Sequence, residues 1–316
     1  MEKKYILTDE IRKSNGKILH RIQAVRDFGK IQTGDLGGWI EKEGNLSHEG
    51  DCWIDDNAKV YDNALVYDNA LVYGNAQVRG DAKVYDNAYI SGNALIYGNT
   101  MVRGNALVSD SVQICGHTVI QGNALVRGNA LVRGDALVSG NALVHGNAQI
   151  YDNALVNGYA QVYDNAQIYG NAKVSGNVLI YGDAIICEEM FVSYSKIDTD
   201  LRIDIAASLR GQCNLLLIKN KVIVYKIVNR NLTSLYDKNF VYKIGEIAEV
   251  ENPDESNASC ASGLHFSNLT YWDDNVQKYK DKTYLVAEIN VEDIITIQQG
   301  KIRCKKAKIL DKVDIQ

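Results

Sequence analysis

Proline is almost missing from this sequence: the 316 residues contain a single one, Pro253. Proline has no backbone N–H to donate to a sheet ladder, so a chain rich in strands has few positions for it. The scarcity of proline therefore favours a chain made mostly of paired strands.

Paired cysteines and long apolar runs are also missing. The six cysteines contain no C-x-x-C pair and stand at Cys52, Cys115, Cys187, Cys213, Cys260 and Cys304. Such scattered residues favour reduced thiols in a cytoplasm over a disulfide framework. No apolar run approaches the roughly twenty residues of a membrane-spanning helix, and no secretory apolar region follows Met1. We therefore expect a cytoplasmic protein with no membrane partner.

Basic residues are in deficit. Lys and Arg number 34 against 39 Asp and Glu, which gives a formal net charge of −5. Between Asp55 and Ser193 there are 13 acidic and 7 basic residues. A protein that binds double-stranded nucleic acid needs a basic stripe, so we expect no nucleic-acid partner.

What the sequence does contain is a six-residue period. From Ile54 to Val192 every sixth residue, twenty-four in all, is Val or Ile. An alanine usually stands two residues before each of them, and a Gly-Asn, Asp-Asn or Gly-Asp pair usually precedes that alanine. A fixed period of this kind is the signature of a repeat architecture.

The repeat at 75–80 indicates what the period builds. Ala76 and Val78 alternate with Gln77 and Arg79, which is the alternation of a strand, and Gly80 tolerates the positive φ of a corner. Stacked about 4.8 Å apart, such short strands bury columns of Val, Ile and Ala. Each buried Val or Ile contributes about 1.5–3 kcal/mol, and stacked asparagines can hydrogen-bond to one another.

These hexads resemble the hexapeptide repeat of left-handed parallel β-helices, in which three hexads form one triangular coil. The resemblance implies the left-handed sense. The runs Ala24–Phe28, Gly37–Trp39 and Gly50–Ile54 further resemble the start of capped β-helix proteins of bacteria and phages, which are catalogued as uncharacterised acetyltransferases. The predicted fold is mainly β: a left-handed parallel β-helix of about eight coils, with an N-terminal β cap and a C-terminal α+β domain.

The chain divides into four parts: a cap at 1–53, the β-helix at 54–193, a linker at 194–200 and the C-terminal domain at 201–316. In the cap, Asn15-Gly16 predicts a hairpin turn, and Trp39 or Trp53 closes the open apolar end. In the C-terminal domain we expect strands at 214–218, 221–228, 283–290 and 294–298, and a helix at 271–280.

The outward-facing residues form three rows, because every third hexad shares a face. One row is mostly polar and two are mostly apolar. Large exposed apolar surfaces mark interaction sites, so the apolar rows predict an interface with a second copy, in a dimer or trimer, or with a protein partner. Its residues are Leu71, Tyr89, Leu107, Leu125, Leu143 and Leu179 on one face and Leu65, Met101, Leu137 and Leu155 on the other.

An enzyme is the alternative. The resemblance implies a hexapeptide-repeat acyltransferase with a histidine as general base and acetyl-CoA as cofactor; the candidates are His145, His117 and His265. The repeat has no inserted loop to enclose acyl-CoA, and no acidic residue is placed to orient His117 or His145. A zinc site would need three histidines, and the repeat has two on different faces, so we expect no metal.

The segment Cys260–Ser267 resembles a small domain of phage and mobile-element proteins without an assigned activity. Gly263–Ser267 and Tyr284–Glu288 also resemble ADP-ribosyltransferase-like folds, although Tyr225–Val228 lacks their His or Arg motif. This resemblance implies nucleotide binding by the C-terminal domain.

Together these patterns predict a non-enzymatic interaction protein without a cofactor: a rigid β-helix scaffold that presents apolar faces. The alternatives are an acyl-CoA-dependent acyltransferase and a nucleotide-binding or ADP-ribosyltransferase-like C-terminal domain.

Overall fold

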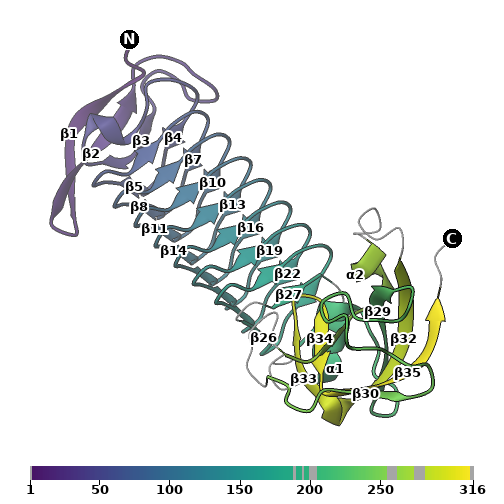
Figure 1. Ribbon diagram of the computed structural model, residues 1–316. Helices are drawn as coiled ribbons and strands as arrows, with labels where there is room; N and C mark the ends of the chain where they lie inside the picture. The colour runs from purple at the N-terminus through teal and green to yellow at the C-terminus, as the bar shows by residue number, and fades with distance from the viewer. Residues whose placement is uncertain are drawn as a thin grey trace. The chain divides into compact units, whose positions relative to one another are not determined.

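The computed structural model describes residues 2–187, 190–193, 196–198, 205–254, 262–273 and 282–313. The chain forms two compact units, Met1–Glu188 and Glu189–Gln316. Both are built mainly from strands, as predicted; Figure 1 labels their elements.

Each hexad of the first unit contributes one strand of two residues, which ends at the buried Val or Ile. In chain order these strands are β4 (Trp53–Ile54), β5 (Lys59–Val60), β6 (Leu65–Val66), β7 (Leu71–Val72), β8 (Gln77–Val78), β9 (Lys83–Val84), β10 (Tyr89–Ile90), β11 (Leu95–Ile96), β12 (Met101–Val102), β13 (Leu107–Val108), β14 (Gln113–Ile114), β15 (Val119–Ile120), β16 (Leu125–Val126), β17 (Leu131–Val132), β18 (Leu137–Val138), β19 (Leu143–Val144), β20 (Gln149–Ile150), β21 (Leu155–Val156), β22 (Gln161–Val162), β23 (Gln167–Ile168), β24 (Lys173–Val174), β25 (Leu179–Ile180) and β26 (Ile185–Ile186). Two more follow, β27 (Phe191–Val192) and β28 (Lys196–Ile197).

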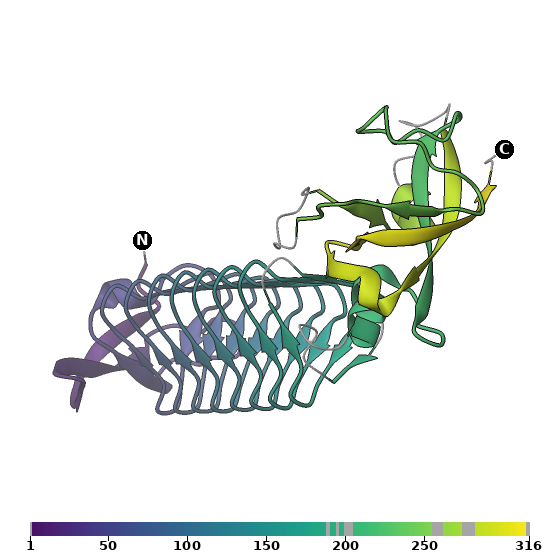
Figure 2. The same cartoon turned by 60° about the horizontal axis from the view of Figure 1, so that its bottom comes forward.

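Strands three apart in the chain are neighbours, so the repeat winds into three sheets. The first contains β5, β8 and so on to β26, the second runs from β4 to β28, and the third from β6 to β27. The strands β4–β27 thus make eight coils of three, and Figure 2 shows the coils of the first unit as a regular stack. The predicted parallel β-helix is confirmed.

The interior explains the strict period. Val132 and its partners in register on the neighbouring coils, Ile114 and Ile150, are all 0% exposed. The coils are joined by backbone hydrogen bonds such as the one from Leu131 N–H to the Ala148 carbonyl, at 2.9 Å. An inserted residue would turn these inward side chains to the opposite face.

The corners are held by glycine, aspartate and asparagine. Gly98 has a φ of +79°, and a Cβ there would lie 2.9 Å from the Gly116 carbonyl oxygen. Aspartate takes the same position in other coils at φ between 53° and 62°. Beside these corners run the predicted asparagine ladders, in which Asn105 donates to Asn123 at 3.0 Å and Asn123 donates to Asn141 at 3.0 Å.

The cap continues the first sheet. β1 (Tyr5–Ser14) and β2 (Lys17–Ala24) form the predicted hairpin, with Asn15 and Gly16 at φ +48° and +77°. β3 (Leu36–Ile40) pairs antiparallel with β2 and parallel with β5. The short helix η1 (Glu43–Asn45) follows β3.

Both tryptophans predicted to close the cap are buried. Trp53 is 1% exposed and meets the Phe28 ring edge-on, with centroids 5.4 Å apart. Trp39 is 4% exposed and lies under the Arg12 guanidinium. Lys4 is buried beside them; its Nζ donates to the Cys52 carbonyl at 2.8 Å, and burial lowers its pKa.

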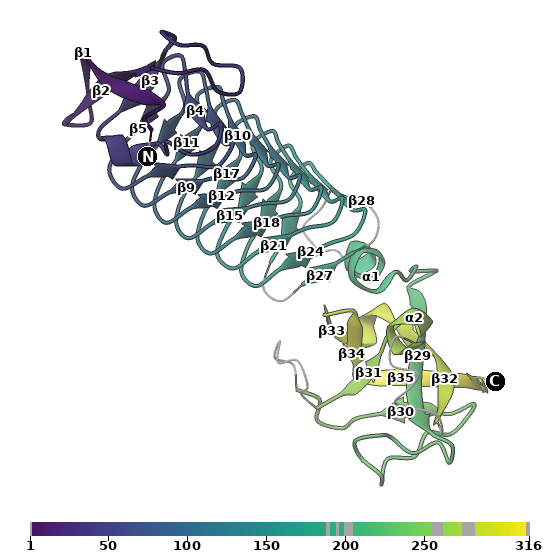
Figure 3. The same cartoon turned by 90° about the horizontal axis from the view of Figure 1, so that it is seen from above.

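The second unit contains a four-stranded sheet ordered β29-β32-β35-β30 and a three-stranded sheet ordered β31-β34-β33, both antiparallel (Figure 3). Its elements are α1 (Ile205–Cys213), β29 (Lys221–Asn229), β30 (Ile247–Glu249), β31 (Leu264–Phe266), α2 (Leu269–Asp273), β32 (Lys282–Asn290), η3 (Val291–Asp293), β33 (Ile294–Gln298), β34 (Lys301–Cys304) and β35 (Lys306–Val313). Three of the four strands predicted here are confirmed, as β29, β32 and β33.

Some local predictions were wrong. Of residues 214–218, predicted as a strand, 214–217 are irregular chain after the unpredicted helix α1, and Ile218 forms only an isolated bridge with Lys221. Leu215 packs on the core whereas Leu216 is 66% exposed, so the alternating burial of a strand is present without a sheet. β28 lies within the stretch 194–200 that we expected to be a linker. Of the predicted helix at 271–280, α2 includes the start, and 274–281 lie outside the described residues.

Candidate functional site

The structure places the three candidate histidines in separate surroundings. His117 stands in an asparagine row, where its Nδ1 lies 3.3 Å from Asn99 Nδ2. His145 stacks on the Tyr163 ring with centroids 4.9 Å apart. Burial, and then the nearby Arg127, lower the pKa of His145. His117 and His145 are thus embedded in surface stacks of the solenoid.

His265 belongs to the second unit, on β31. Burial lowers its pKa to about 4, and the neighbouring cations Lys226, Lys301 and Arg303 act in the same direction. The imidazole is therefore neutral at pH 7. Across the described ranges, no group of three or more His, Cys, Asp and Glu side chains is close enough to share a metal ion.

The predicted interface residues lie in straight rows on two sheets. Tyr89, Leu107, Leu125 and Leu143 are successive partners in register on β10, β13, β16 and β19. Tyr89 and Leu107 are each 36% exposed. On the third sheet Met101, Val119, Leu137 and Leu155 are paired in the same way. Each row is half-buried by its own neighbours and keeps an apolar edge toward solvent.

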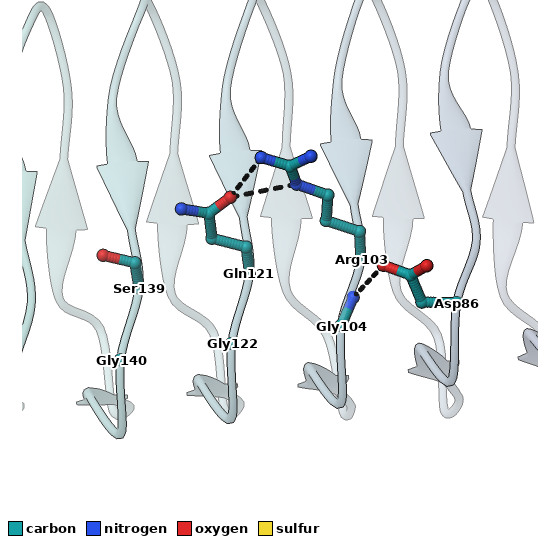
Figure 4. Close-up of a pocket in the computed structure, with 7 residues that line it drawn as sticks. All are labelled: Asp86, Arg103, Gly104, Gln121, Gly122, Ser139 and Gly140. Atoms are coloured by element: carbon teal, nitrogen blue, oxygen red, sulfur yellow. Dashed lines mark hydrogen bonds between the residues drawn. The ribbon is translucent and has the colours of Figure 1, made fainter.

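An unpredicted groove lies along one corner of the solenoid (Figure 4). Its volume is about 370 Å³, and it is shallow and open. We call it the Arg103 groove; it is lined by Asp86, Arg103, Gly104, Gln121, Gly122, Ser139 and Gly140.

The side chains that follow the buried Val or Ile shape this groove. Tyr67 stacks on Tyr85 with centroids 4.8 Å apart. On the next coil Arg103 donates from Nη1 to the Tyr85 hydroxyl at 3.3 Å, and from Nε and Nη2 to Gln121 Oε1 at 2.9 and 2.6 Å. The short Ser139 comes next, so the row drops from long to short side chains and leaves space. The sequence signal for the groove was the 18-residue spacing of the row Tyr67, Tyr85, Arg103, Gln121 and Ser139.

The second unit has a buried cation on β29. Lys226 is 6% exposed; its Nζ donates to the His265 carbonyl at 2.9 Å and lies 5.7 Å and 5.5 Å from the ring centroids of Tyr242 and Phe266. Burial lowers the pKa of Lys226 to about 8, and the Cys304 thiol acts in the opposite direction. The charge is buried with one carbonyl partner and two aromatic faces around it.

This burial predicts a pH dependence of stability. The folded pKa of Lys226 lies below its ordinary 10.5, so the unfolded chain binds more protons between about pH 8 and 10.5, and the contribution of Lys226 to stability rises with pH in that window. Relative to Lys226→Met, the wild type should gain roughly 3 kcal/mol in unfolding free energy from pH 7 to 10.5. Urea denaturation of both chains measures the difference. Lys238→Met, at an exposed site, keeps Lys226 and should gain as much as the wild type; equal slopes for all three chains would contradict the assignment.

Glu288, at the end of the segment that resembles ADP-ribosyltransferase-like folds, forms an ion pair with Lys221 at 2.7 Å. Gly263 precedes β31, and Ser267 exchanges backbone hydrogen bonds with Tyr225 of β29. The motif residues Cys260 and Ala261 lie outside the described residues. Nucleotide binding by this unit stays a prediction.

In the described part of the chain, Cys52, Cys115, Cys187, Cys213 and Cys304 form no disulfide. Among the described helices, none has the length and apolar character needed to cross a membrane.

Comparison with known proteins agrees with this architecture. The family model described as "YdcK Beta solenoid repeat" matches residues 58–74, 66–80, 148–164 and 166–179. The chain is also similar to the "Uncharacterized acetyltransferase YdcK" of Escherichia coli (strain K12), with 48% identity over 42 residues. That stretch is 13% of this chain and 13% of that protein. Residues 222–316 match a family described as a domain of unknown function, DUF7666. The first unit is therefore a parallel β-solenoid similar to the YdcK repeat, and residues 222–316 are similar to a domain of unknown activity.

Proposed function

We propose that this protein is a non-enzymatic scaffold whose β-helix associates with a second copy or with a protein partner through its two apolar rows. The observation that carries the proposal is the unbroken register of Tyr89, Leu107, Leu125 and Leu143 along one sheet. A flat apolar row of this kind, partly open to solvent, is typical of an interaction surface.

The backbone supports a scaffold role because the rows cannot easily rearrange. Each outward residue of the rows follows a buried small residue, usually alanine, and precedes a buried Val or Ile, and its backbone is bonded to the next coil. Leu107 N–H, for example, donates to the Ala124 carbonyl at 2.9 Å. A surface fixed in this way loses little conformational entropy when a partner binds.

The proposal is tested by making one row polar. We expect the triple change Leu107→Gln, Leu125→Gln and Leu143→Gln to leave the fold intact, because Gln149 and Gln167 already stack in register on the first sheet. The association should weaken, so the mass from sedimentation equilibrium should fall to that of a monomer of 35.0 kDa.

The matched control places the same substitution on the polar face, as Leu95→Gln with Leu131→Gln on β11 and β17. This control should keep the wild-type mass. A wild type that is already monomeric and captures no partner from its native host, or a triple variant with unchanged mass, would refute the interface.

An acyltransferase is the second candidate, and the similarity to a protein named as an acetyltransferase favours it. Calorimetric titration of the full chain with acetyl-CoA decides between the two. Saturable binding of acetyl-CoA that His145→Ala or His117→Ala abolishes would support the acyltransferase. If millimolar acetyl-CoA produces no heat of binding, the scaffold remains the proposed function.

A further inference from the structure

The corners of the solenoid show which group fits against them. At seven corners an aspartate of one coil accepts a hydrogen bond from the backbone N–H of the residue 18 positions later, on the next coil. Asp86 is one of them: its carboxylate accepts from Gly104 N–H at 2.9 Å (Figure 4). At these seven corners the backbone N–H is therefore a carboxylate-binding position.

In the Arg103 groove this position is open. Gly104 has no side chain that could accept a hydrogen bond from Gly122 N–H. Gly122 likewise has no side chain that could accept one from Gly140 N–H. Within the described part of the chain no acceptor lies on either N–H, and both residues are exposed. Two donors, about 4.8 Å apart along the stack, thus face the groove.

Arg103 supplies the positive charge beside these donors. Its guanidinium has five N–H groups. Three of them donate to Gln121 and Tyr85, which fixes the plane of the group and leaves two for a ligand. Asp68 and Asp86 already bind N–H groups on successive coils, so a carboxylate one coil beyond Asp86 repeats an arrangement that the chain itself uses.

We propose that the Arg103 groove binds the carboxylate group of a ligand, held by the backbone N–H groups of Gly122 and Gly140, with the Arg103 guanidinium supplying positive charge on the adjoining strand. At one end of the groove Arg103 is bonded to Tyr85, and at the other end the short Ser139 leaves room for the rest of the ligand. This site lies at a corner, apart from the apolar rows, and does not depend on the proposed scaffold function.

The test is a titration of the full chain with glutarate, followed through backbone amide NMR signals. We expect saturable shifts of the Gly122 and Gly140 amides. Gly74, whose N–H is bound by Asp56 at a corner that does not line the groove, should stay unshifted and serves as an internal control. Glutaramide, which has the same shape without charge, should shift none of them.

Two variants separate the groups that bind. Gly104→Asp should place its own carboxylate on Gly122 N–H, as Asp68 and Asp86 do on their neighbours, and weaken glutarate binding about tenfold or more. Gly98→Asp makes the same change at another corner and should leave binding intact. Arg103→Gln, which does not alter the corner, should weaken binding about threefold, the scale of an exposed charge pair.

Three results would overturn the proposal. The first is the absence of Gly122 and Gly140 shifts with glutarate. The second is equal shifts with glutaramide. The third is a preference for inorganic phosphate over glutarate at the same amides, which would assign the site to phosphate instead of a carboxylate.

Discussion

Replacing Val132 with aspartate is expected to prevent the β-helix from folding. Val132 is 0% exposed between Ile114 and Ile150 in the middle of the stack. A carboxylate there would lose its water without gaining a partner, at a cost of several kcal/mol, while the stability of a typical protein is only about 5–15 kcal/mol.

Circular dichroism and gel filtration of Val132→Asp measure this effect. Because each coil contacts only its two neighbours, disruption of β17 also separates the coils before it from the coils after it. The matched control is Leu131→Asp, on the same strand but facing outward and half-exposed. The control should fold, and a Val132→Asp chain with the wild-type spectrum and denaturation midpoint would contradict the interior assigned to Val132.

The second large effect is expected from Trp53→Ala in the cap. Trp53 is the largest fully buried side chain of the described residues, and it fills the space beside Phe28, Tyr5 and the backbone of Gly37. Truncation of a buried tryptophan costs about 3–5 kcal/mol. We expect a lower urea midpoint and new large species in sedimentation velocity, because a loosened cap exposes the unpaired end of the stack.

Tyr159→Ala is the control for this experiment. Its ring is 64% exposed, so its removal should change the unfolding free energy by no more than about 0.5 kcal/mol. If Trp53→Ala behaves like Tyr159→Ala in both measurements, the first coil is stabilised by other contacts and the cap does not depend on Trp53.

Much of the first unit follows from local sequence. The period fixes which residues point inward, so the repeat alone assigns Val132 and its equivalents to the interior. Asn15-Gly16 was sufficient for the hairpin because few pairs of residues adopt positive φ so readily. The outward rows were also predictable, since three hexads per coil bring Leu107, Leu125 and Leu143 into line.

The second unit was harder to predict because it has no period. Its apolar segments alternate as strands do, and whether such a segment pairs depends on distant residues. The residues at 221–229 and 282–290 find each other as β29 and β32. Those at 214–218 have the same alternation but belong to no named strand. The burial of Lys226 under Phe266 and Tyr242 likewise depends on contacts far apart in the chain.

The sequence by itself determined the stacked coils, their buried columns, the hairpin and the rows on each face, because a six-residue repeat specifies its own neighbours at 18 residues. Only the tertiary structure showed that the shortening of the side chains along one row, from Arg103 to Ser139, leaves an open groove. It alone showed which corner N–H groups are taken by aspartate and which are open, as at Gly122 and Gly140. The physical reason is that these features depend on the contacts between successive coils and not on the pattern within one hexad.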